Sequence, residues 1–240
     1  MSIREFDIVD KLNTPAEEAY KVLRTNIQFC TLDGNLKTIA MTSTFSGEGK
    51  TTTCINLAIA AAKDGKKVLY VDADMRKSIS MKDFAHRASS GLSNYLSHMA
   101  DFQSIVKETN VKNLYMVSCG VKPPNAAELL GTHTFREFLT EAAGKFDFVI
   151  VDTPPLGSVI DCAIIANQTD GVVLVVKRKT VDFRKILRVK QQLEKANARI
   201  LGVVLNKIEK SDYQTYYKYY NYHSGGESEV KRFKKKKQKF

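Results

Sequence analysis

A phosphate-binding motif occupies residues 44–51, with the sequence Thr-Phe-Ser-Gly-Glu-Gly-Lys-Thr. It matches the pattern Gly-x-x-x-x-Gly-Lys-Ser/Thr, except that Thr44 replaces the first glycine. In such a loop, backbone N–H groups and the start of the next helix point at phosphate oxygens, Lys50 adds a positive charge and Thr51 offers its hydroxyl to magnesium. We therefore expect a nucleotide to contact Ser46, Gly47, Glu48, Gly49, Lys50, Thr51 and Thr52.

Three aspartates follow two apolar runs and supply further groups for phosphoryl transfer. Asp72 and Asp74 follow the run 68–71, and Asp152 follows the run 148–151. Side chains two residues apart on an extended chain point the same way, so Asp72 and Asp74 are expected to face one site. Phosphoryl transfer needs magnesium held, the phosphate charge offset and the nucleophile oriented or deprotonated. Two carboxylates can serve the metal, and one remains for the nucleophile, either water or a protein hydroxyl.

The elements that position these residues are predicted from apolar periodicity. Short apolar runs predict strands at residues 38–42, 68–71, 148–151, 171–176 and 200–205. The last four runs are apolar throughout, which is typical of strands buried on both faces of a parallel sheet. Helical patterns occur at residues 14–29, 52–63, 126–143, 160–167 and 181–195. The order predicts an α/β fold with a doubly wound, mostly parallel sheet, in which ligands bind at the carboxyl ends of the strands.

The composition is that of a soluble globular protein. Of the 240 residues, 43% are hydrophobic and 26% are charged, which excludes the disordered, fibrous and disulfide-stapled classes. The apolar runs are far shorter than the roughly 18 residues that a membrane span needs. Four cysteines without paired spacing, Cys30, Cys54, Cys119 and Cys162, indicate neither a zinc site nor a disulfide framework. We therefore expect a cytoplasmic protein.

The last thirty residues differ from the rest, so we expect a catalytic domain at 1–210 and a flexible extension at 211–240. Residues 224–240 hold seven basic and two acidic side chains, a net charge of +5 out of +11. This charge would be attracted to nucleic acid or to an anionic membrane surface. A tyrosine cluster precedes it, which suits a low-complexity linker, a stacking platform for single-stranded nucleic acid or a set of phosphoacceptors. Its members are Tyr213, Tyr216, Tyr217, Tyr219, Tyr220 and Tyr222.

Taken in order, these features resemble the bacterial tyrosine kinases, in particular the free-standing kinases of Gram-positive capsule and exopolysaccharide clusters. The matching segments are residues 46–51, 71–76 and 151–152 and the tyrosine cluster, and the resemblance covers essentially the whole chain. It implies a P-loop NTPase fold of the deviant Walker type, with ATP and Mg²⁺ bound by Lys50 and Thr51. It also implies that Asp72 is the base for an incoming tyrosine hydroxyl and that Asp74 and Asp152 lie on the metal side.

The resemblance also implies assembly and partners. The family forms rings through a helix motif Glu-x-x-Arg-x-x-Arg, to which Glu18, Lys21 and Arg24 correspond. Lys21 stands where arginine is expected and lacks its planar fork, which puts ring stability in question. Asn206, at the end of the last strand, is expected to contact the adenine edge.

The function implied is autophosphorylation of the tyrosine cluster between subunits, which regulates polysaccharide polymerisation and export. The implied partners are a transmembrane adaptor whose cytoplasmic tail activates the kinase at the inner membrane face, a cognate phosphotyrosine phosphatase and other cytoplasmic protein substrates.

Two other functions remain as alternatives. Partition and septum-placement ATPases share this sheet and hydrolyse ATP as a dimerisation switch. They carry a second lysine early in the phosphate loop, and residues 43–46 contain none. A nucleic-acid-binding module leaves the three carboxylates unexplained, so we do not expect nucleic acid as a partner.

Overall fold

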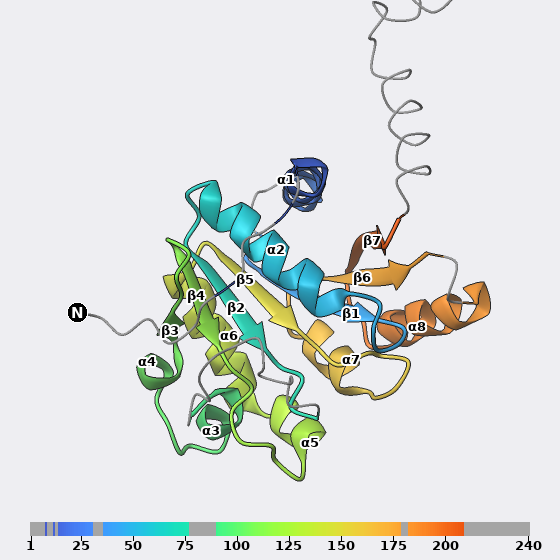
Figure 1. Cartoon of the computed structure of the whole chain (residues 1–240). Coiled ribbons are helices and arrows are strands. Elements are labelled where there is room, and N and C mark those ends of the chain that lie inside the picture. Colours follow the sequence, from blue (N-terminus) through green and yellow to red (C-terminus); the bar gives the residue numbers. More distant parts are fainter. Residues whose placement is uncertain are drawn as a thin grey trace, which may run out of the picture. The chain divides into compact units, whose positions relative to one another are not determined.

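The structure is a computed structural model that describes residues 8, 12, 14–30, 36–76, 90–178 and 182–208 (Figure 1). The helices are α1 (Thr14–Phe29), α2 (Lys50–Lys63), α3 (Leu92–Leu96), α4 (Phe102–Ile105), α5 (Ala126–Leu130), α6 (His133–Lys145), α7 (Asp161–Ala166) and α8 (Phe183–Lys195). The strands are β1 (Thr38–Ser43), β2 (Val68–Asp72), β3 (Lys107–Glu108), β4 (Leu114–Val117), β5 (Phe148–Asp152), β6 (Gly171–Lys177) and β7 (Ile200–Asn206).

The strands form one seven-stranded sheet in the order β3-β4-β2-β5-β1-β6-β7. Every pair is parallel except β3 with β4 at one edge. The phosphate-loop strand β1 therefore lies between β5 and β6, and β2 lies on the other side of β5. In the β2–β5 register Asp72 pairs with Asp152, so two of the predicted acids stand side by side where their strands end.

Helices cover both faces of the sheet, as the continuous apolar runs predicted. The helices α1 and α2 lie on one face, and α5, α6, α7 and α8 lie on the other (Figure 1). Alternate strand residues divide between the two cores. Ile39, Tyr70 and Ile150 pack with α2, whereas Leu69 and Val151 pack on the opposite face. Asp72 and Asp152 follow Tyr70 and Ile150 by two residues, which places them on the α2 face.

Several elements differ from the sequence prediction. The single helix expected at 126–143 is wrong, because Gly131 ends α5 and Thr132 is extended before α6 begins at His133. The predictions also missed β3, β4, α3 and α4, which are only two to five residues long. The other predicted helices and strands are confirmed to within two residues at each end.

The described helices contain no apolar stretch long enough to cross a membrane. The chain divides into a compact unit, Met1–Asn206, and a second unit, Lys207–Phe240, of which the structure describes only residues 207 and 208. The predicted boundary at 210/211 and the tyrosine cluster at 213–222 lie outside the described residues and stay predictions.

Candidate active site

The phosphate loop connects β1 to α2 and has the backbone shape that its glycines permit. Gly47 and Gly49 have φ angles of 83° and 91°, in the left-handed region that strains residues with side chains. Gly49 caps α2, whose first turn begins with Lys50 and Thr51. The first N–H groups of a helix lack partners within the helix and carry its positive dipole end. The loop can therefore hold an anion through its backbone.

Glu48 holds the loop in place rather than facing solvent. Its buried carboxylate accepts hydrogen bonds from the backbone N–H of Phe45 at 2.7 Å and of Lys177, at the end of β6, at 3.0 Å. The side-chain amide of Asn206 donates to the Glu48 carbonyl at 3.0 Å. Two of the predicted nucleotide contacts thus fix the loop to the ends of β6 and β7, and adenine recognition by Asn206 stays a prediction.

A second loop, residues 153–160 after β5, packs against the phosphate loop. The Leu156 N–H donates to the Ser43 carbonyl at 2.9 Å, and a Cβ at Gly157 would collide with the Thr44 carbonyl. Thr44 is buried, and its hydroxyl has no hydrogen-bond partner among the described residues. An unpaired buried hydroxyl beside a cradle of backbone N–H groups suits a bound phosphate group.

Lys50 and Asp152 form a buried ion pair at the centre of the site. The Lys50 ammonium donates to Asp152 Oδ1, and the Tyr70 hydroxyl donates to Oδ2 at 3.1 Å. Burial alone lowers the pKa of Lys50, but the Asp152 carboxylate and the other nearby acidic groups outweigh it and hold that pKa above its ordinary value. Lys50 is therefore charged at neutral pH and available to a phosphate.

Asp72 is buried beside this pair. Burial, and next the negative charge of Asp152, raise the pKa of Asp72 from 3.8 to about 8, against the lowering effects of the Asp74 N–H and Lys50. The Asp74 N–H donates to Asp72 Oδ1 at 3.0 Å, and Asp74 itself is half-buried. A carboxylate whose pKa lies near neutrality is suited to accept a proton during a reaction.

Sequence reasoning missed an ion pair that joins the two acid-bearing loops. Arg76, after β2, forms two hydrogen bonds to the buried carboxylate of Asp161, at 2.7 and 2.9 Å, and Asp161 begins α7. The pairing joins residues 85 positions apart, so spacing alone does not reveal it. The arginine in the motif at residues 71–76 was its only sequence signal.

The expected magnesium ligands fit the chemistry of that ion in part. No three His, Cys, Asp or Glu side chains among the described residues come close enough to form a metal site by themselves. Magnesium prefers oxygen donors and takes one or two carboxylates together with substrate phosphates and water. Thr51, Asp74 and Asp152 supply oxygens of this kind around the phosphate loop, so they would hold the ion together with ATP.

The ring-motif residues pair within the chain. Lys21 contacts Glu18 at 2.6 Å on the exposed face of α1. Arg24 contacts Asp64, at the end of α2, at 2.6 Å. The structure therefore places Arg24 between two helices of one subunit, and its role in assembly stays a prediction.

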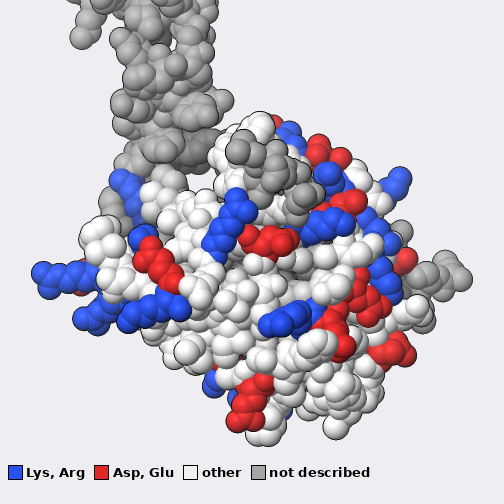
Figure 2. All heavy atoms as spheres, turned by 180° about the vertical axis from the view of Figure 1, so that it is seen from behind, with Lys and Arg blue, Asp and Glu red and all other residues white. Residues whose placement is uncertain are grey.

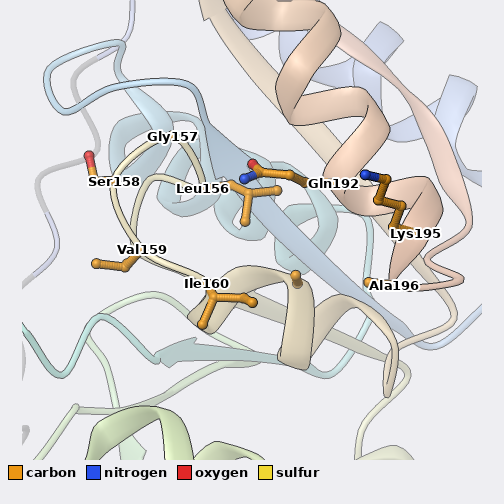
Figure 3. A pocket seen from close by; sticks show the side chains of 9 residues that line it. Leu156, Gly157, Ser158, Val159, Ile160, Gln192, Lys195 and Ala196 are labelled. Carbon is orange, nitrogen blue, oxygen red and sulfur yellow. The ribbon is translucent and has the colours of Figure 1, made fainter.

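The surface adds two observations. A pocket of about 440 Å³ lies between the loop after β5, α7 and α8, and Leu156, Ile160, Gln192 and Lys195 are among its lining residues (Figure 3). None of the residues 44–51 lines it, so it is not the phosphate site. On the face shown in Figure 2, basic and acidic side chains of the described residues are interspersed, unlike the continuous basic stripe that binds nucleic acid.

Curated relatives agree with this chemistry. Residues 36–208 match the family model described as an AAA domain. Tyrosine-protein kinase CpsD of Streptococcus agalactiae is 41% identical over 196 residues, which cover 81% of this chain and 84% of that protein. Tyrosine-protein kinase YwqD of Bacillus subtilis is 37% identical over 199 residues, which cover 83% and 84%.

Solved structures show the same likeness. The chimerical protein CapA2B2 has a TM-score of 0.79 at 32% identity, covering 86% of this chain and 94% of that one. The kinase domain of the Escherichia coli tyrosine kinase ETK has a TM-score of 0.78 at 31% identity, covering 81% and 76%. The septum site-determining protein MinD of Pyrococcus horikoshii, solved with Mg-ADP, has a TM-score of 0.62 at 25% identity, covering 74% and 72%.

The MinD likeness confirms the predicted fold, a P-loop NTPase related to the septum-placement ATPases. CpsD and YwqD are tyrosine-protein kinases, and each match covers more than four fifths of both chains. The chain therefore belongs to the bacterial tyrosine-kinase family and is a tyrosine-protein kinase with an ATP-binding phosphate loop.

Proposed function

We propose that this kinase transfers the γ-phosphoryl group of ATP to tyrosines at positions 213–222 of a neighbouring copy. The observation that carries the proposal is the pairing of Asp72 with Asp152 at the ends of β2 and β5, beside Lys50. A switch ATPase needs only to orient a water molecule, whereas transfer to tyrosine also needs a base for the phenol proton, which is the role that we propose for Asp72. The tyrosine cluster of this same chain supplies six hydroxyl acceptors.

The transfer step divides the work among the three side chains. The acceptor phenol oxygen forms a bond to the γ-phosphorus, the bond from that phosphorus to the β–γ bridging oxygen breaks, and ADP leaves. Asp72 accepts the phenol proton late in the step, because a phenol with a pKa near 10 is a poor nucleophile until it loses that proton. Lys50 offsets charge on the phosphates, and Thr51, Asp74 and Asp152 would hold magnesium. When bound, that ion would supply further neutralisation of phosphate charge.

The partners are part of the proposal. By the family resemblance, the kinase acts with a transmembrane adaptor whose cytoplasmic tail activates it at the inner membrane face. A phosphotyrosine phosphatase reverses the modification, and other cytoplasmic proteins are further substrates. Six phosphates of roughly −1.5 to −2 charge each on the adjacent tyrosine cluster would outweigh the +5 charge of residues 224–240 and release that segment from an anionic membrane. This cycle would regulate capsule or exopolysaccharide polymerisation and export.

The test is a phosphosite map of the purified protein. The wild type is incubated with magnesium and ATP, with and without the cytoplasmic tail of its adaptor, beside Lys50→Met and Asp72→Asn variants. We expect phosphotyrosine within residues 213–222 in the wild type, more with the adaptor tail, and none in the Lys50→Met variant. ATP hydrolysis without phosphotyrosine in either condition would contradict the proposal and indicate a switch ATPase.

A further inference from the structure

The two oxygens of Asp152 have different partners. Oδ1 accepts from Lys50, and Oδ2 accepts from the hydroxyl of Tyr70 at 3.1 Å. Asp152 is fully buried and Tyr70 is 1% exposed, so water does not compete for either contact. The carboxylate is therefore held at both ends, by a cation on one side and by a neutral donor on the other.

Tyr70 reaches Asp152 because of the parallel register. Tyr70 pairs with Ile150, two residues before Asp152, and both side chains lie on the sheet face covered by α2. Tyr70 is buried, and its hydroxyl donates to Oδ2 of Asp152 from within the core. Cys54 of α2 also hydrogen-bonds Asp152, but a thiol is a weak donor. Tyr70 is thus the stronger of the two neutral hydrogen-bond donors to this carboxylate.

ATP binding is expected to affect the Lys50 and Tyr70 contacts of Asp152 differently. The lysine of a phosphate loop contacts the β- and γ-phosphates, so it must share or release Oδ1 of Asp152 when ATP binds. The hydroxyl of Tyr70 is enclosed in the core under α2. We therefore expect this hydroxyl to keep its hydrogen bond to Oδ2 when ATP binds. One oxygen of Asp152 is freed while the other stays fixed.

We propose that Tyr70 is a positioning residue that fixes Oδ2 of Asp152, so that Oδ1 passes from Lys50 to the magnesium side of the site without rotation of the carboxylate. Hydrogen-bonded partners of metal-side carboxylates generally orient them in this way. The inference rests on the proposed role of Asp152 at the metal side and is independent of which hydroxyl accepts the phosphate.

The test compares Tyr70→Phe with Tyr115→Phe. Phenylalanine keeps the ring and removes only the hydroxyl. Tyr115 lies on the neighbouring strand β4, and the structure records no hydrogen bond of its hydroxyl among the described residues. Binding of a fluorescent ATP analogue is titrated against magnesium and also measured in EDTA. We expect Tyr70→Phe to raise the magnesium concentration at half-saturation about tenfold and to leave binding in EDTA within about twofold. Tyr115→Phe should match the wild type in both.

A double-mutant comparison shows whether Tyr70 acts through Asp152. In an Asp152→Ala background, Tyr70→Phe should cause no further shift in the magnesium midpoint, because both oxygens of its partner carboxylate are gone. An unchanged midpoint for Tyr70→Phe, an equal loss of binding with magnesium and in EDTA, or full additivity with Asp152→Ala would each overturn the inference. These titrations need no phosphoryl transfer, so they remain decisive even when the wild type shows no phosphotyrosine and the proposed function fails.

Discussion

At the scale of single residues, Asp72 is the group whose chemistry is most altered by the fold. It lies in register with Asp152 and is almost fully buried, so two carboxylates share one low-dielectric site with a single lysine. Burial and the neighbouring charge raise the pKa of Asp72 to about 8. The same burial that prepares Asp72 to accept a proton therefore disfavours its ionised form in the folded protein.

This raised pKa predicts a pH dependence of stability. The folded state binds more protons than the unfolded state between the unfolded pKa of 3.8 and the folded pKa of about 8. The contribution of Asp72 to the free energy of unfolding therefore falls as pH rises through this window. Asp72→Asn removes that slope, so the variant should gain stability relative to the wild type between about pH 5 and about pH 8, measured by urea denaturation. A constant difference across this range would contradict the burial argument.

At the scale of elements, loops rather than helices hold the acids in place. Arg76 and Asp161 join the loop after β2 to the start of α7, and Gly157 lets the loop after β5 touch the phosphate loop. These contacts join the three carboxyl-terminal loops to one another, so we expect changes in their packing to change ATP affinity.

The Arg76–Asp161 pair is expected to contribute to stability. Arg76→Met leaves the fully buried Asp161 carboxylate without its cation and should lower the free energy of unfolding by about 2 kcal/mol, less than for a fully buried pair because Arg76 is 45% exposed. Adding Asp161→Asn removes the unpaired charge and should recover most of that loss, measured by urea denaturation. A double variant no more stable than the single one would show that the charge is not the cause.

Two glycine substitutions separate loop contact from backbone flexibility. Gly157→Ala places a methyl group against the Thr44 carbonyl, so the loops must part and ATP affinity should fall about tenfold, or ~1.4 kcal/mol, by titration. Gly144→Ala, on α6, meets no atom within 4 Å and should stabilise the protein by about 0.5–1 kcal/mol without changing ATP affinity. Equal ATP affinity in the two variants would argue against the loop contact.

The strands show which elements could be predicted from the sequence and which could not. β1, β2, β5, β6 and β7 were predicted because apolar residues on both faces are a strong local signal. β4 was missed because Leu114–Val117 is short and Tyr115 is only half-buried.

The active site, too, could be predicted from the sequence only in part. Lys50, Asp72 and Asp152 were predicted to meet, because parallel strands end at one edge of the sheet. The roles of Tyr70, Glu48 and Asp161 depend on register and contacts between distant segments, which no spacing in the sequence encodes.

At the scale of the whole molecule, the proposed function needs two copies. Lys21 pairs with Glu18 on an exposed face, and exposed pairs of this kind are weak. Lys21→Arg restores the planar fork of the family motif and should shift the protein toward larger assemblies in sedimentation velocity, with Lys112→Arg as a control on another surface. Identical sedimentation of the two variants would argue against α1 as the assembly face.

The central claim is that the site containing Lys50 and Asp72 phosphorylates the tyrosine cluster of another copy. The most direct measurement mixes two chains, neither of which can phosphorylate its own tyrosine cluster. One is a tagged Lys50→Met chain that keeps its tyrosines, and the other has an intact site but carries phenylalanine at Tyr213, Tyr216, Tyr217, Tyr219, Tyr220 and Tyr222. After incubation with ATP and magnesium, the account predicts phosphotyrosine on the tagged chain at residues 213–222. A tagged chain that carries none, while the wild type alone is phosphorylated there, would contradict transfer between subunits.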